Sequence, residues 1–135
     1  METASDIFAI ERNTGRTTRR IQFALNRLLA GQETQVIYLW PVNNSKDYPL
    51  RIAITFLQQT PSREFFQVNM KLNRIYLPNG RLFRVMDACR ETNEAASYYN
   101  AMVLFDHACN EYDEFRPAKC WWPYQKRADE LVGLE

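Results

Sequence analysis

The hydrophobic positions of this chain alternate between helical and strand spacing. Ile21 and the leucines after it share one face of a predicted helix, with Thr17 or Thr18 as N-cap and Gly31 just beyond its end. The apolar run QVIYLWP at residues 35–41 is typical of a central parallel strand that is buried on both faces. The pattern further predicts a strand at 7–10, a helix at 47–59, a β-hairpin at 67–77 and 81–86, a strand at 102–105 and a helix at 125–132.

The predicted hairpin turns at Asn79-Gly80. An Asn-Gly pair between two apolar runs is a strong hairpin signal, because both central positions of a type I′ turn need positive φ. Arg74, Arg81 and Arg84 lie near this turn, in a segment with few acidic residues. These arginines predict a contact with the phosphates of a nucleic acid or, alternatively, the protection of strand edges from pairing.

The alternation of strands and helices predicts one α/β domain over residues 1–135, with three layers, a mainly parallel sheet and the hairpin. In this arrangement the strand at 102–105 is expected to be central. The chain is 46% hydrophobic and 24% charged, with a formal net charge of +1, so it has no strong overall attraction for nucleic acid or membrane. We expect a cytoplasmic protein without a membrane partner, because neither an apolar run of ~20 residues nor a signal peptide is recognisable.

Candidate chemistry begins in the polar loop before the first helix. Its residues are Asn13, Thr14, Gly15, Arg16, Thr17 and Thr18. In a Walker A loop, glycines let backbone N–H groups approach phosphate, a Lys reaches the phosphate oxygens, and a Ser or Thr hydroxyl coordinates magnesium. Gly15-Arg16-Thr17 matches the end of that pattern with Arg in the Lys position. The alternative is a helix-capping loop with exposed arginines.

A second candidate group follows the strand at 102–105. This strand ends on Asp106, which is how a Walker B segment presents a magnesium-directing carboxylate. His107 stands where many ATPases carry the Glu that polarises the attacking water. An imidazole can act as a base near neutral pH, although a lone His is more often a structural hydrogen-bonding group.

These segments together resemble the P-loop NTPase core of phage terminases and helicase-like proteins. The resemblance is carried by GRTTR, QVIYLWP, LPNGRLFRV and VLFDHAC, and it covers residues 7–109. It implies that the loop 13–18 binds the phosphates of ATP or GTP, that Thr17 and Asp106 hold Mg²⁺, and that the protein is encoded by a phage or mobile element. Only 29 residues follow Asp106, so we do not expect a stand-alone motor.

Two functions therefore stand as predictions. The first is a small nucleotide-binding protein with weak or no hydrolysis. The second is a catalytically inactive interaction or inhibitor protein, which binds another protein or nucleic acid through the hairpin and the tail that carries Trp121 and Trp122. Arg16 separates the two: it either reaches phosphate or pairs with Asp106 and fills the site.

Overall fold

The computed structural model describes residues 15–41, 46–60 and 65–134. Its helices and strands in chain order are α2 (Arg16–Leu29), β1 (Gln35–Trp40), α3 (Asp47–Gln59), β2 (Gln67–Asn69), β3 (Arg74–Tyr76), β4 (Leu82–Asp87), β5 (Met102–Phe105), α4 (Ala108–Glu111) and α5 (Gln125–Val132). The predicted helices at 47–59 and 125–132 and the strand at 35–41 are confirmed. The strand predicted at 7–10 lies outside the described residues.

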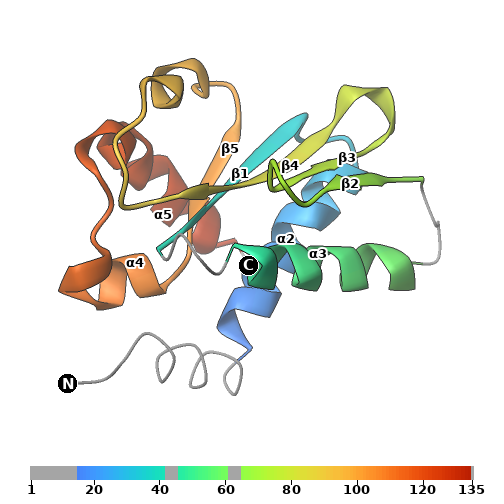
Figure 1. Cartoon of the computed structure of the whole chain (residues 1–135), viewed down its shortest axis with the longest axis horizontal. Coiled ribbons are helices and arrows are strands. Elements are labelled where there is room, and N and C mark those ends of the chain that lie inside the picture. Colours follow the sequence, from blue (N-terminus) through green and yellow to red (C-terminus); the bar gives the residue numbers. More distant parts are fainter. Residues whose placement is uncertain (1–14, 42–45, 61–64, 135) are drawn as a thin grey trace.

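The described strands form one sheet in the order β2-β3-β4-β1-β5 (Figure 1). β1 is parallel to both of its neighbours, β4 and β5, whereas the β2–β3 and β3–β4 pairs are antiparallel. The sheet is thus mixed, and the prediction of a mainly parallel sheet is corrected. The prediction of a central strand at 102–105 is also wrong, because β5 is at one end of the order of the described strands, with β4 in the middle and β1 between β4 and β5. α5 packs against β5, and the four residues of β5 are all buried.

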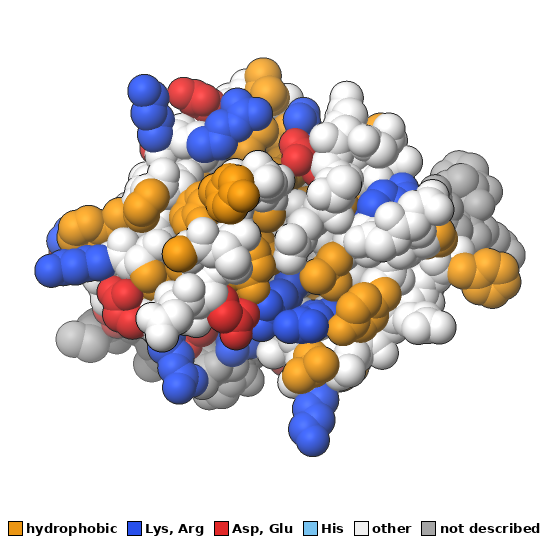
Figure 2. Space-filling model, turned by 90° about the horizontal axis from the view of Figure 1, so that it is seen from above, with side chains coloured by type: hydrophobic (Ala, Val, Ile, Leu, Met, Phe, Trp, Pro, Cys, Tyr) orange, Lys and Arg blue, Asp and Glu red, His pale blue; other side chains and the backbone are white. Residues whose placement is uncertain are grey.

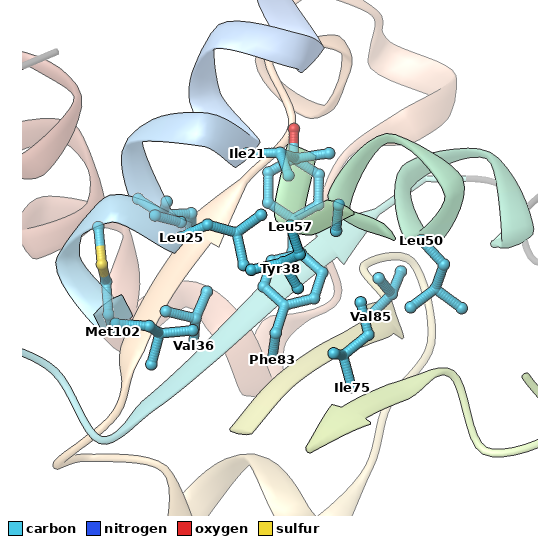
Figure 3. Packing of buried hydrophobic residues seen from close by; sticks show 14 of the residues in the cluster. Ile21, Leu25, Val36, Tyr38, Leu50, Leu57, Ile75, Phe83, Val85 and Met102 are labelled. Carbon is cyan, nitrogen blue, oxygen red and sulfur yellow. The ribbon is translucent and has the colours of Figure 1, made fainter. Parts of the chain in front are cut away.

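Alternate residues of β1 enter two hydrophobic cores on opposite faces of the sheet, as the two-residue period of a strand requires. Val36, Tyr38 and Trp40 pack with side chains of α2 and α3, and Figure 3 shows the Tyr38 ring close to Ile21 of α2 and Leu57 of α3. Ile37 and Leu39 pack instead with side chains of α5 and of the segment before it. Helical segments therefore cover both faces of the sheet, and the protein is α/β.

The predicted hairpin contains three strands rather than two. The run at 67–77 folds back on itself as β2 and β3, with Asn73 at a φ of 57° in the turn between them. The next turn, between β3 and β4, places Asn79 at a φ of 64° and Gly80 at 75°. These positive φ values are those that the Asn-Gly pair predicts. The first turn was not predicted, although the alternation of apolar residues at 68, 70 and 72 shifts by one position before it resumes at 75 and 77.

Candidate functional site

The candidate site lies where α2 begins. Gly15 is the N-cap, at a φ of 70° that costs a glycine little, and no side chain caps the helix. The prediction of a threonine N-cap is therefore wrong: Thr17 and Thr18 already belong to the first turn. That turn has no acidic residue, and the helix carries the positive end of its dipole here. Asn13 and Thr14 lie outside the described residues.

The structure brings Thr17 and Asp106 together, although 89 positions separate them in the sequence. The Thr17 hydroxyl donates a hydrogen bond to Asp106 Oδ1 at 2.8 Å, and both side chains are 1% exposed. The Tyr38 hydroxyl donates to the same oxygen at 2.6 Å, and the Ala108 N–H donates to Oδ2 at 3.2 Å. Asp106 is thus held beneath the first turn of α2 by donors from α2, β1 and α4.

Tyr38 is a site residue that the sequence analysis missed. Burial raises its pKa well above the usual value, and the negative charge of Asp106 raises it further, so the phenol stays neutral and donates its proton. The sequence feature that could have indicated Tyr38 is its hydroxyl, the only one in the apolar strand 35–41, on the same face as Val36 and Trp40. A buried Tyr usually has a hydrogen-bond partner, but the sequence does not tell which residue provides it.

Arg16 pairs with Glu111 rather than with Asp106. The guanidinium makes a two-pronged contact with the Glu111 carboxylate, in which Nη2 lies 3.3 Å from Oε2. His107 Nδ1 lies 3.4 Å from Glu111 Oε2, and His107 Nε2 lies 3.8 Å from Asp106 Oδ2. Burial raises the pKa of Glu111, but the hydrogen bond from Arg16 and the charges of His107 and Arg16 outweigh it, so the net shift is downward. Glu111, which the sequence analysis did not assign to the site, therefore joins it.

A hollow of about 360 Å³ opens beside these residues. Arg20, His107 and Glu111 line one side of it, and α5 lines the other. Arg20 Nη1 donates to the Phe105 carbonyl at 2.7 Å, which ties the second turn of α2 to the end of β5. The candidate site is therefore next to an open space at the carboxyl end of β5.

Thr17 and Asp106 provide too few oxygen ligands to hold Mg²⁺ without other ligands. A carboxylate offers about four lone-pair positions, and three on Asp106 already accept hydrogen bonds. Within the described part of the chain, no group of three or more His, Cys, Asp and Glu residues is placed to hold a metal ion. Mg²⁺ keeps several waters and often takes its other ligands from phosphates. These residues therefore fit a hydrated ion that arrives with a nucleotide, not a metal cage made by the protein alone.

The hairpin arginines contact the protein itself. Arg81 Nη1 donates to the Leu28 carbonyl at 2.8 Å, at the C-terminal end of α2. Arg84 Nη1 donates to Glu94 Oε2 at 2.9 Å and also contacts the Tyr98 hydroxyl. Arg74 pairs in register with Arg84 on the neighbouring strand. In Figure 2, basic and acidic side chains are interspersed with hydrophobic ones on the face shown, and these contacts favour a structural role for Arg81 and Arg84.

The two adjacent tryptophans have different surroundings. Trp121 is fully buried in the core beneath β1, so it is not a surface contact for a partner. Trp122 is 51% exposed, and its Nε1 donates to the Pro117 carbonyl at 3.0 Å. Of the pair, only Trp122 is placed to meet a ligand or partner.

Comparisons with known proteins give no match: no family model, no curated protein and no solved structure is similar to this chain at the threshold of significance. Among the helices that the structure describes, none has the length and apolar character needed to cross a membrane.

Proposed function

We propose that this protein binds a nucleoside triphosphate, ATP or GTP, together with Mg²⁺ at the N-terminus of α2, and that it hydrolyses the nucleotide weakly or not at all. The observation that carries the proposal is the buried hydrogen bond between Thr17 and Asp106. It links the first turn of a glycine-initiated helix to the residue that follows a parallel strand. Ligands of open α/β sheets bind at such carboxyl ends of strands.

The first turn of α2 favours an anion. Backbone N–H groups of a first helical turn have no partner within the helix and point toward its N-terminus. Three arginines, Arg16, Arg19 and Arg20, follow Gly15 within five residues, and the first turn has no acidic residue to oppose them. Phosphate is the anion that this combination of N–H groups and guanidinium groups binds well.

The hydrogen bond to Asp106 also orients the Thr17 hydroxyl for a cation. A hydroxyl has one hydrogen and two lone pairs, and the hydrogen of Thr17 is directed at Asp106. Because the hydrogen is used in this way, Mg²⁺ would meet the oxygen through a lone pair, which is what it requires of a hydroxyl ligand. Asp106 would act on the ion through water, since most of its own acceptor positions are in use.

Two contacts argue for weak hydrolysis. His107, which occupies the position expected for a base, is 7% exposed and lies between the carboxylates of Asp106 and Glu111. Each ring nitrogen therefore faces a carboxylate of the protein itself, so the ring is not oriented to take a proton from a water beside the phosphate. Arg16 must also exchange its contact with Glu111 for a contact with phosphate, so Glu111 competes with the nucleotide.

This competition gives a direct test. Glu111→Gln removes the competing charge, and because an exposed ion pair contributes up to about 1 kcal/mol, we expect Mg-ATP to bind about two to five times more tightly. Asp47→Asn is the matched control, because it removes an exposed carboxylate that pairs with Arg51 at 3.4 Å within α3, and it should leave affinity unchanged. The measurement is isothermal titration calorimetry with Mg-ATP and Mg-GTP. Absence of binding by the wild-type protein at millimolar nucleotide would refute the proposal.

An interaction protein is the second candidate function. Large hydrophobic side chains are exposed along and beside the edge strand β2, namely Phe65 at 92%, Leu72 at 48% and Met70 at 41%. Exposed apolar groups that gather in one place often mark a protein contact. If neither nucleotide binds, this surface becomes the better indication of function.

A further inference from the structure

A groove between α4 and α5 extends away from the Arg16–Glu111 ion pair. It consists of the hollow of about 360 Å³ beside Glu111 and an adjoining hollow of about 620 Å³. Asn110, Gln125 and Asp129 line both hollows, so the two adjoin at these side chains. Trp122 lines the far hollow. We call this space the α4–α5 groove; the proposed phosphate site and the groove share the Glu111 side chain as a border.

We propose that the α4–α5 groove binds the nucleoside half of the nucleotide, with the base stacked on Trp122 and the ribose and base edge bonded by the polar residues in the middle. This inference rests on the proposed function, because the phosphates would lie at the N-terminus of α2. It adds the class of ligand that the site prefers: a nucleotide with its base, rather than any polyphosphate.

The middle of the groove carries the hydrogen-bonding groups that a nucleoside needs. The amides of Asn110 and Gln125 each offer a donor and an acceptor, which is the pattern that base edges present. Gln125 Nε2 donates to Asp129 Oδ1 at 3.0 Å, a bond that uses one carboxylate oxygen and fixes both side chains. The carboxylate of Asp129 can accept from ribose hydroxyls, as an acidic residue does in dinucleotide-binding folds.

Trp122 provides a surface for stacking at the far end. Its ring is half exposed, and the hydrogen bond from Nε1 to the Pro117 carbonyl fixes its orientation before any ligand arrives. Lys119 Nζ lies 5.9 Å from the ring centre. A preorganised ring loses little conformational freedom when a base stacks on it, so most of the stacking energy contributes to binding.

The charges of the groove favour a nucleoside over a nucleic acid strand. Glu111, Asp113 and Asp129 line the two hollows, and Arg116 on the same wall pairs with Asp113 at 3.5 Å. A strand would place a phosphate near these carboxylates at every nucleotide, whereas one nucleotide keeps its phosphates at the α2 end. Nucleic acid binding depends on basic side chains that neutralise phosphates, and the groove has no excess of them among its described lining residues.

Quenching of tryptophan fluorescence can report on Trp122 separately from the other tryptophans. The sequence has three tryptophans, and Trp40 and Trp121 are fully buried, so iodide quenches mainly Trp122. We expect Mg-ATP to protect this fluorescence from iodide, and Mg-tripolyphosphate to bind without protecting it. Trp122→Leu should weaken Mg-ATP binding about tenfold and leave tripolyphosphate binding unchanged. Tyr99→Leu, which removes an aromatic ring that is 76% exposed outside the groove, should leave both unchanged.

The outcomes separate this inference from the proposed function. If tripolyphosphate binds as tightly as ATP and Trp122→Leu changes neither, the groove inference is wrong while the phosphate site stands. If neither ligand binds but adenosine protects Trp122, the proposed function fails and the groove inference stands. Protection by a single-stranded oligonucleotide but not by ATP overturns the inference in favour of a nucleic acid strand. No protection by any of these ligands overturns it outright.

Discussion

Replacing Thr17 by Val tests whether the buried bonds to Asp106 hold the site together. Valine keeps the shape of threonine but cannot donate, so Asp106 Oδ1 loses the bond at 2.8 Å while it keeps the one from Tyr38 at 2.6 Å. A hydrogen bond to a charged group contributes about 1.5–3 kcal/mol, so we expect the free energy of unfolding to fall by that amount. Tyr38→Phe should cost about the same, since it removes the other hydroxyl from the same oxygen.

The double variant, Thr17→Val with Tyr38→Phe, gives a more discriminating change in the free energy of unfolding. With both hydroxyls removed, the buried Asp106 carboxylate keeps only the Ala108 N–H bond at 3.2 Å. The loss should exceed the sum of the single losses by at least about 0.5 kcal/mol, because each hydroxyl partly compensates for removal of the other. Urea unfolding followed by tryptophan fluorescence measures all three variants. A loss below about 0.5 kcal/mol for Thr17→Val, or strict additivity, would refute the account of a shared buried carboxylate.

Two further predictions concern residues around the site. Arg81→Met should lower the free energy of unfolding by about 1–2 kcal/mol, because the guanidinium bonds the Leu28 carbonyl at the end of α2; urea unfolding measures it, and no loss would show that the contact contributes nothing. Burial and the Asp106 charge raise the pKa of Tyr38, so its stabilising effect is complete below the usual phenol pKa of about 10 and is lost as the pH rises further. In an alkaline absorbance titration, wild type and Tyr38→Phe should give the same signal near pH 10 and differ by one ionising tyrosine only at higher pH. A difference between the two folded proteins near pH 10 would contradict the burial of Tyr38.

The elements that the sequence predicted well depend on local patterns. α3, α5 and β1 each have a periodicity or an apolar run that lies within one segment, and the structure places them at the predicted residues. Asn79 and Gly80 adopt positive φ because few other residues do so cheaply, which also makes their turn readable. For these parts of the chain, local chemistry and the final fold agree.

The errors concern distant partners. A continuous apolar run reports that both faces of a strand are buried, not how many strands flank it, and β5 was placed wrongly for this reason. Arg16 pairs with Glu111, and not with Asp106, because hydroxyl donors enclose Asp106 beneath α2, whereas Glu111 lies beside Arg16 at the surface. Arg81 similarly bonds a residue far away in the sequence, because its guanidinium donates to the Leu28 carbonyl at the end of α2. Such pairings follow from the assembled sheet, which no single segment encodes.

The most direct test of the proposed site compares two variants that lose the same kind of bond. Thr17→Val and Tyr38→Phe each remove one hydroxyl from Asp106 Oδ1, but only Thr17 lies in the first turn of α2. Mg-ATP is titrated into wild type and both variants by calorimetry, under conditions where each is folded. The account predicts that Thr17→Val weakens binding about tenfold or more and that Tyr38→Phe changes it by less than about threefold. Equal losses in both variants, or wild-type protein that binds no Mg-ATP, would contradict it.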